Sequence, residues 1–513
     1  MPGFVALAAM VGIAMLIWDC VEVGRNDAAN LVNAILGARV MRRRLAIAIA
    51  AFAVVLGASF SSPVMETARK GIFDPSVLTV QMALAIYVSV YFVDTILLYG
   101  FSGFGMPVST TACLVFELVG AALFLVGFDN VQWSKVGTVT VGIVVSIVIS
   151  GTAAFLVMRI FRAAIGKTLG DRKATMLHGP WIAGAIASWL VWFMLFKGLK
   201  NIEYVKYVKS LTFEAYGEVP VLLGLWVAFT VCTYVLLLTL PRDWSRHLFS
   251  TTAVLGMICL AFAFGQNDLA NAASPGLAGL ALWQSGSAPG DVADIATKIP
   301  IPVFALFGCG LLMAMGMFTI YAQRVTGAQI KTGSQVDEVT LYAPRWCKWI
   351  ASTLLGFGRS RPDTAAAPAR QESDQTVHYD TLRASVITAV SASVIAFASG
   401  RGLLVSTTYV AFAAVLGSGL ADRVFSRGDS DTKLGRAIWV ISCWFIAPVI
   451  AVVATGCVAL IVYHLSTAGL VLCIGLNLGS RLILKRRADR HEQLHHETSP
   501  REASVGEPEG QLT

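Results

Sequence analysis

Charged side chains are scarce in this chain. Asp, Glu, Lys and Arg make up 14% of its 513 residues, against about 25% in a typical soluble domain. Apolar residues make up 56%, and the mean hydropathy is +0.69. The low charge excludes an ordinary soluble enzyme, and the apolar excess excludes a disordered chain, which keeps little apolar surface in water. These values predict an all-α polytopic membrane protein.

Paired cysteines and an N-terminal basic segment are also absent. The nine cysteines include no C-x-x-C pair, so we expect neither a cysteine metal site nor a disulfide framework. No Lys or Arg precedes the first apolar run, whereas a cleaved signal peptide begins with a basic stretch. We therefore expect the first segment to be a retained span. The net charge of +8 is interpreted as basic cytoplasmic loops, with no nucleic-acid partner.

Long apolar runs recur along the whole sequence. Some are short or interrupted, so we expect about 10–13 membrane segments, half-spans included. The runs cover residues 4–23, 44–60, 78–100, 107–127, 136–158, 181–199, 218–240, 250–272, 300–321, 385–401, 404–421, 437–463 and 467–484.

Basic residues follow the odd-numbered runs. They cluster at 39–44, 159–173, 242–246 and 485–487, which places all four clusters on the cytoplasmic side. The N-terminus is then outside and the C-terminus cytoplasmic. The lysines of 197–218 fit this orientation poorly. We expect a multi-pass protein of the plasma membrane, most simply a bacterial inner membrane, with the lipid bilayer as its surroundings.

Two stretches have a non-membranous composition. Residues 322–384 contain an Ala/Pro run and predict a flexible cytoplasmic loop. Residues 485–513 are rich in charge, Gly and Pro and predict a disordered tail. The expected organisation is a first repeat (1–160), connecting segments (161–248), a second repeat (249–463) interrupted by that loop, a terminal membrane segment (464–484) and the tail.

A seven-residue motif occurs twice. Residues 24–30 read G-R-N-D-A-A-N, and residues 265–271 read G-Q-N-D-L-A-N. Gly permits a helix to break, and an ionised Asp inside a membrane needs a partner, water or an ion. Carboxylate and amide oxygens suit Na⁺ or another hard cation, and a carboxylate can also carry a proton. We therefore expect a shared cation or coupling site formed by Asp27, Asp268, Asn26 and Asn267; polar helix packing is the alternative.

A second motif, V-S-T-T, also occurs twice, at 108–111 and 405–408. Each copy follows a Gly-containing break, so Ser or Thr opens a helix whose free N–H groups, hydroxyls and positive dipole end suit an anion. Back-bonding of the hydroxyls within a helix is the alternative. Cation-type and anion-type ligands side by side favour coupled symport, because a bridging cation or proton relieves the repulsion between anion and carboxylate.

The two halves are expected to be inverted in the membrane. The first motif ends the first apolar run and its twin ends the eighth, so seven crossings separate them. An odd number reverses the orientation of the second copy, as in inverted-repeat transporters.

These motifs resemble those of the inorganic phosphate transporter (PiT) family, the phosphate/cation symporters, over most of residues 5–463. The resemblance implies broken helices from both halves around a midplane site, and import of inorganic phosphate with Na⁺ or H⁺ by alternating access. It implies cation and phosphate binding at Asp27, Asn30, Asp268 and Asn271, with Na⁺ on the two aspartates if sodium is the coupling ion. It also implies substrate contacts from the helix-opening residues Ser109, Thr110, Thr111, Ser406, Thr407 and Thr408.

Some positions depart from the family pattern, namely Arg25, Phe264, Ala112, Tyr409, Leu404 and Ser274. Arg25 could bind the anion through a bidentate contact or pair with an acid, either Asp19, Glu22 or Asp27. Asp94 and Glu117 also lie in apolar runs, as proton-relay groups or as polar contacts inside the bundle.

Three other functions compete with phosphate symport. A sulfate or related oxyanion permease would use the same fold, but protonated phosphate can donate a hydrogen bond to a carboxylate and sulfate cannot. An intramembrane aspartyl protease would use Asp27 and Asp268 as a dyad, and leaves V-S-T-T unexplained. A non-transporting receptor predicts no flux. We expect no enzyme activity and no cofactor other than the coupling ion; a homodimer stays open.

Overall fold

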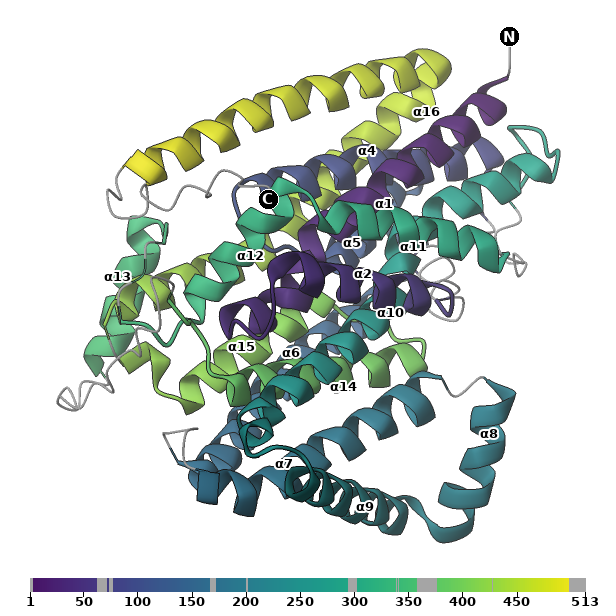
Figure 1. Cartoon of the computed structure of the whole chain (residues 1–513). Helices are drawn as coiled ribbons and strands as arrows, with labels where there is room; N and C mark the ends of the chain where they lie inside the picture. The colour runs from purple at the N-terminus through teal and green to yellow at the C-terminus, as the bar shows by residue number, and fades with distance from the viewer. Residues whose placement is uncertain are drawn as a thin grey trace, which may run out of the picture.

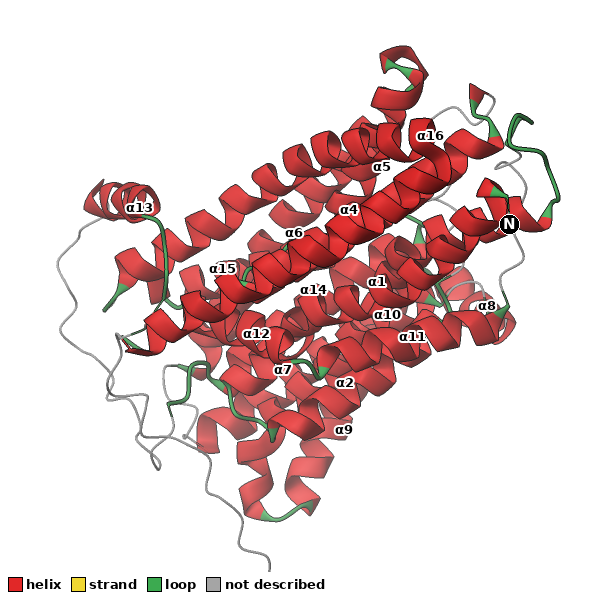
Figure 2. Cartoon of the chain, turned by 90° about the horizontal axis from the view of Figure 1, so that it is seen from above, coloured by secondary structure: helices red, strands yellow, loops and turns green. Residues whose placement is uncertain are grey.

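The computed structural model describes residues 3–61, 72, 77–166, 172–199, 202–293, 302–337, 339, 341–357, 376–426 and 428–497. These residues form helices throughout, with one isolated β-bridge between Thr79 and Val292. Most of the long helices run roughly parallel or antiparallel to one another (Figures 1 and 2). The all-helical membrane architecture predicted from composition is confirmed.

Long helices alternate with short turns along the chain. The helices are α1 (Phe4–Gly37), α2 (Arg43–Ala58), α4 (Val80–Gly103), α5 (Thr110–Val126), α6 (Trp133–Ile165), α7 (Arg172–Val191), α8 (Glu203–Lys209), α9 (Glu218–Thr239), α10 (Leu248–Gln284), α11 (Val303–Met317), α12 (Ile320–Thr332), α13 (Arg345–Phe357), α14 (Thr381–Gly400), α15 (Thr407–Ala421) and α16 (Ser430–Glu497). Short 3-10 or π turns cover Phe128–Asn130, Trp192–Gly198, Ser210–Glu214, Arg242–His247 and Val424–Ser426.

Within the described ranges, eight helices are long and apolar enough to cross a membrane, or up to nine if the bent pair α11–α12 is one span. Two apolar helices, α5 and α15, are shorter. The long helix α16 changes direction at Ser466, whose φ of 49° is not helical, between the apolar runs 437–463 and 467–484. Because some helices are short and others bend sharply, the apolar runs identified in the sequence coincide only partly with whole helices.

The motif-bearing helices α1 and α10 pass through the middle of the bundle, and the motif glycines allow their neighbours to approach. A Cβ on Gly24 would lie 1.9 Å from the carbonyl oxygen of Met313 on α11, and one on Gly265 would lie 2.2 Å from that of Val54 on α2. Both helices are continuous through these glycines. The motif glycines therefore serve close helix packing, and the helix break that glycine permits does not occur at either of them.

The chain breaks instead directly before each V-S-T-T motif. Helix α4 ends at Gly103 and α5 begins at Thr110, while α14 ends at Gly400 and α15 begins at Thr407. Gly105 and Gly402 adopt φ values of 65° and 68°, which only glycine adopts without strain. Each turn lets a new helix start deep inside the protein.

Two predicted irregular stretches are partly helical. The predicted loop 322–384 contains most of α12 and all of α13, and α12 bends by 67° away from α11. The predicted disordered tail 485–513 begins with the end of α16, which extends to Glu497. The Ala/Pro run and residues 498–513 lie outside the described residues.

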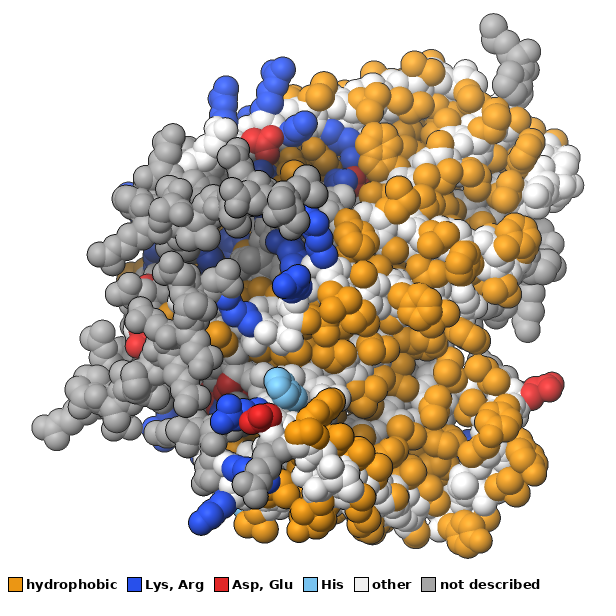
Figure 3. All heavy atoms as spheres, viewed as in Figure 1, with side chains coloured by type: hydrophobic (Ala, Val, Ile, Leu, Met, Phe, Trp, Pro, Cys, Tyr) orange, Lys and Arg blue, Asp and Glu red, His pale blue; other side chains and the backbone are white. Residues whose placement is uncertain are grey.

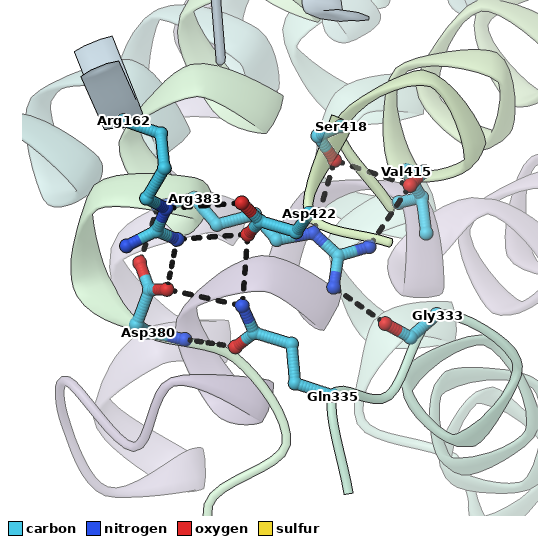
Figure 4. A network of polar contacts seen from close by, with 8 residues as sticks. All are labelled: Arg162, Gly333, Gln335, Asp380, Arg383, Val415, Ser418 and Asp422. Carbon is cyan, nitrogen blue, oxygen red and sulfur yellow. Dashed lines mark hydrogen bonds and ion pairs between the residues drawn. The ribbon is translucent and has the colours of Figure 1, made fainter. Parts of the chain in front are cut away.

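A polar network joins the start of α14 to the ends of α6, α12 and α15 (Figure 4). Arg162 forms ion pairs with Asp380 and Asp422, and Gln335 donates to both carboxylates, at 3.0 and 2.9 Å. Arg383, fully buried, donates to the Gly333 carbonyl directly after α12 and to the Val415 carbonyl within α15. A cation beside a helix C-terminus satisfies a carbonyl that the helix leaves free, as Arg383 does at Gly333.

Charge is distributed unevenly over the surface. In Figure 3, Lys and Arg side chains gather on the left, whereas the right is mainly apolar. The left is also the side on which α1 ends in the view of Figure 1. Apolar surface of this extent suits contact with lipid.

Candidate functional site

The two G-x-N-D-x-A-N motifs place their polar side chains in the protein interior. Asn26, Asp27 and Asn30 lie on α1, and their counterparts Asn267, Asp268 and Asn271 lie on α10. None is more than 4% exposed. Asp27 and Asp268 are both fully buried, and two carboxylates of one buried site repel each other when both are ionised, so a cation or proton beside them is favourable.

The two V-S-T-T motifs place helix starts beside these side chains. Ser109 caps α5 by accepting a hydrogen bond from the Ala112 amide at 3.0 Å, and Ser406 caps α15 by accepting from the Tyr409 amide at 3.1 Å. The threonines that follow occupy the first turns of the two helices. A first helical turn directs its N–H groups and positive dipole end outward, which favours an anion.

Each carboxylate accepts a hydrogen bond from the other half of the chain. Thr408 Oγ1 donates to Asp27 Oδ1 at 2.7 Å, and Thr110 Oγ1 donates to Asp268 Oδ1 at 3.0 Å. The asparagines repeat this exchange, because Asn30 donates to Thr408 at 3.1 Å and Asn271 donates to Thr111 at 2.8 Å. The four motifs therefore form one buried cluster.

Backbone carbonyls fix the turns around this cluster. Asn26 donates to the Val108 carbonyl at 2.7 Å, and Asn267 donates to the Val405 carbonyl at 3.0 Å. Two hydroxyls of the opposite halves approach the same two carbonyls. Thr111 donates to the Val405 carbonyl at 2.9 Å, and Thr408, which donates its one proton to Asp27, lies 3.2 Å from the Val108 carbonyl. Asn26 and Asn267 thus fix, by these hydrogen bonds, the non-helical segment that precedes α5 and α15 respectively.

Four oxygens of the cluster are buried without a hydrogen-bond partner in the described part of the chain. Three are carboxylate or amide acceptors, Asp27 Oδ2, Asp268 Oδ2 and Asn271 Oδ1, and the fourth is the hydroxyl of Thr407. An unpaired buried acceptor costs about 1–3 kcal/mol, and a bound cation, a proton or a protonated oxyanion satisfies it. Hard oxygen ligands of this kind fit Na⁺. Across the described ranges, no group of three or more His, Cys, Asp or Glu side chains is arranged to hold a metal ion.

Gln329 on α12 belongs to this cluster, and the sequence analysis missed it. Its Nε2 donates to Asn30 Oδ1 and its Oε1 accepts from Asn33 Nδ2, both at 2.8 Å. This bond directs the Asn30 amide so that its N–H group faces Asp27. Asn271 Oδ1 has no such partner among the described residues. A single Gln outside any motif gives no signal in the sequence. The one indication was the polar series at residues 27, 30 and 33, whose spacing of three predicts a polar helix face that needs a partner.

Arg25 lies apart from the cluster, in an ion pair. Its Nη1 is 2.8 Å from Glu22 Oε2, and its guanidinium lies over the rings of Tyr99 and Tyr321. Glu22 is one of the three partners considered from the sequence, and Arg481 pairs with it as well, at 2.7 Å. This geometry favours pairing over direct contact with an anion.

Asp94 and Glu117 are also buried, on α4 and α5. Asp94 lies beside Asp19, and both oxygens of Glu117 have no hydrogen-bond partner among the described residues. No hydrogen bond joins Asp94 or Glu117 to the motif side chains in the part of the chain that is described.

The chain is similar in sequence and in fold to known phosphate transport proteins. The sequence profile of the "Phosphate transporter family" matches residues 23–331. A Thermococcus kodakarensis protein named "Putative phosphate permease TK2061" is 28% identical over 463 residues, covering 88% of this chain and 97% of the relative. A "Putative phosphate permease" from Haemophilus influenzae is 23% identical, covering 83% and 89%. A solved structure titled "The sodium-dependent phosphate transporter" aligns with a TM-score of 0.65 at 21% identity, covering 90% of this chain and 98% of that one.

Proposed function

Because the chain belongs to the phosphate transporter family, we propose that it is a secondary active transporter that imports inorganic phosphate by symport with a cation, Na⁺ or H⁺. The single observation that carries this proposal is the buried exchange of contacts, in which each Asp accepts from a Thr of the other half. Catalysis has no part in the proposal.

The chemistry of the cluster supports phosphate as the anion. The N-terminal turns of α5 and α15 supply donors, and the unpartnered oxygens of Asp27 and Asp268 supply acceptors. A protonated phosphate uses both, because it accepts hydrogen bonds and donates one to a carboxylate. Sulfate at neutral pH has no proton to donate and leaves the carboxylates facing its negative charge.

The coupling cation would bind where acceptor oxygens converge. Asp27, Asp268, Asn26 and Asn267 are the proposed coupling residues, with Asn30, Asn271 and the helix-opening residues Ser109, Thr110, Thr111, Ser406, Thr407 and Thr408 as substrate ligands. A cation between the two carboxylates lowers their mutual repulsion and their repulsion of the anion. The two ligands therefore bind together more favourably than either does alone, which is the requirement for symport.

Alternating access is proposed to arise from two inverted halves that rock about this cluster. Every cluster residue is buried, so one half must move against the other before the site meets water. We propose the basic end of the molecule (Figure 3) as the cytoplasmic end, with the N-terminus outside and the C-terminus inside.

The test is uptake of radiolabelled phosphate into proteoliposomes that contain the purified full chain, with an imposed Na⁺ or proton gradient. Gradient-driven uptake that resists excess sulfate and is lost in Asp27→Asn and Asp268→Asn supports the proposal and identifies the ion. Sulfate uptake in place of phosphate would retain the site and change the substrate. No flux of either anion would overturn the proposal.

A further inference from the structure

A cavity of about 590 Å³ lies at the end of the molecule where α1 ends and α2 begins. Arg39, Arg42 and Arg43 line it together with residues of α12, among them Gln323 and Thr326. None of the described residues that line this cavity is Asp or Glu. We name it the arginine vestibule.

Two of these arginines, Arg42 and Arg43, are positively charged and form no ion pair with a carboxylate of the described residues. Neither the Arg42 nor the Arg43 side chain forms a hydrogen bond or an ion pair with any described residue, and Arg43 Nε is buried without a partner. Burial lowers the pKa of Arg39 and Arg43 from the ordinary arginine value. Helix α2 starts here with no side-chain cap and no acidic residue in its first turn, so its positive end adds to the field.

The arginine vestibule and the buried cluster lie at different points along the same helix, α1. Along α1, Asp27, Asn30, Asn33 and Leu36 recur every third residue, and Leu36 lines the vestibule. Nine residues of helix span about 13.5 Å at 1.5 Å per residue. Helix α12 forms the wall between the two, because Gln329 contacts Asn30 and Asn33 while its neighbours line the vestibule.

We propose that the arginine vestibule is a second binding site for a phosphate anion, which the substrate occupies between the buried cluster and the solution at the basic end. The inference rests on the proposed function for the identity of the anion. Guanidinium groups bind phosphate oxygens in bidentate pairs. Two or more of them around an open cavity attract the anion and still release it, because the site stays in contact with water.

Direct binding separates this site from the buried cluster. Radiolabelled inorganic phosphate is titrated against the full chain in nanodiscs of phosphatidylcholine, comparing wild type with the double variant Arg42→Gln/Arg43→Gln. The control is Arg44→Gln, which removes one positive charge one residue further on, at an exposed position that does not line the vestibule. We expect two phosphates per wild-type chain and per Arg44→Gln chain, and at least tenfold weaker binding of the second one in the double variant.

Three outcomes would overturn the proposal. The first is binding of only one phosphate per wild-type chain. The second is an equal loss of affinity for the second phosphate in Arg44→Gln, which would indicate an effect of general surface charge. The third is loss of the second phosphate when phosphatidylglycerol replaces phosphatidylcholine, since a lipid headgroup then occupies the vestibule in its place.

Folding and transport are controlled separately. Retained affinity of the buried cluster shows that the double variant folds, and Arg42→Lys/Arg43→Lys, which keeps the charge without the bidentate geometry, is expected to bind with intermediate affinity. If the double variant does not fold, the lysine variant decides: binding as tight as in wild type contradicts a guanidinium site. Absence of gradient-driven uptake by wild type would refute the proposed function and leave the binding result standing.

Discussion

Thr408 donates a hydrogen bond to Asp27 over 2.7 Å, although 381 residues separate them in the sequence. The same hydroxyl accepts from Asn30 and lies 3.2 Å from the Val108 carbonyl. One hydroxyl group of the second half thus joins a carboxylate, an amide and a helix-preceding turn of the first half.

Removal of this hydroxyl group should weaken substrate binding. The proposed hydrogen bond between this hydroxyl and the charged phosphate contributes about 1.5–3 kcal/mol, so we expect Thr408→Val to raise the KM for phosphate by roughly tenfold or more. Thr408→Ser keeps the hydroxyl and should stay within about threefold of wild type. Initial rates of uptake in proteoliposomes give both values, and equal KM values for the valine and serine variants would contradict the assigned role.

The two motif asparagines should differ in their effect on the coupling ion. Asn271 Oδ1 has no partner among the described residues, whereas Asn30 Oδ1 already accepts from Gln329. As substrate ligands, both asparagines should raise the KM for phosphate when replaced by Leu, and Asn271→Leu, which also removes an unpartnered acceptor oxygen, should raise the half-saturating cation concentration severalfold as well. The measurement is uptake against cation concentration at fixed phosphate. The reverse pattern would place the cation in the first half.

Gln329 should be a positioning residue. Gln329→Leu leaves the amides of Asn30 and Asn33 without their partner, at a cost of about 1–3 kcal/mol for each buried group. We expect a raised KM for phosphate and a lower melting temperature.

Gln329→Glu supplies the test that a merely structural role would fail. A carboxylate accepts but does not donate, so Asn30 turns its N–H group away from Asp27. The variant should raise the KM for phosphate at nearly unchanged kcat and melting temperature, and an unchanged KM would exclude the positioning role.

The motif glycine should tolerate no side chain. Gly24→Ala places a Cβ 1.9 Å from the backbone oxygen of Met313, which must move. We expect low yield of folded protein or loss of several kcal/mol of stability. Gly12→Ala on the same helix is the control, since its Cβ would lie 3.8 Å from Val88 Cγ2, an ordinary contact. Size-exclusion profiles and melting curves in detergent compare them.

The network of Figure 4 predicts how stability changes with pH. Burial alone would raise the pKa of Asp380, but the charge of Arg162 and hydrogen bonds to the carboxylate hold that pKa below its usual range. In the unfolded chain the pKa of Asp is about 3.9. The unfolded state therefore binds more protons in acid than the folded state does, and the free energy of unfolding decreases as the pH falls.

Asp380→Asn should therefore be less stable than wild type at neutral pH. The difference should persist down to about pH 4 and shrink as the pH falls through the lowered pKa of Asp380. Melting temperatures of the two proteins from neutral pH into acid measure this difference. A gap that widens in acid would show that Asp380 does not stabilise the fold through its charge.

The sequence was informative where residues repeat. The doubled motifs identified Asp27, Asp268 and the threonines before any fold was known, because chance seldom places the same acid and amide twice at one spacing. A repeat does not say which copies touch, so the exchange between Thr408 and Asp27 was not predictable. Their roles in transport remain predictions for the experiments above.

The sequence was least informative where helices are short or polar. Helix α12 is too polar for a hydropathy search, so Gln329 fell within a predicted loop. The end of α16 is rich in charged residues, which favour an exposed helix as readily as a disordered tail. Close packing at Gly24 depends on the neighbouring helix, about which the local sequence says nothing.

The exchange of contacts between the halves also sets an order of events during synthesis. Asp27 leaves the ribosome 381 residues before Thr408, which at about 5–20 residues per second is roughly 20–80 s. During that interval α1 carries an acid whose partner has not been made, and an ionised acid in lipid costs several kcal/mol. The nascent first half must therefore keep Asp27 hydrated or protonated until the second half arrives, and a chain that stops before residue 408 never completes the surroundings of this carboxylate.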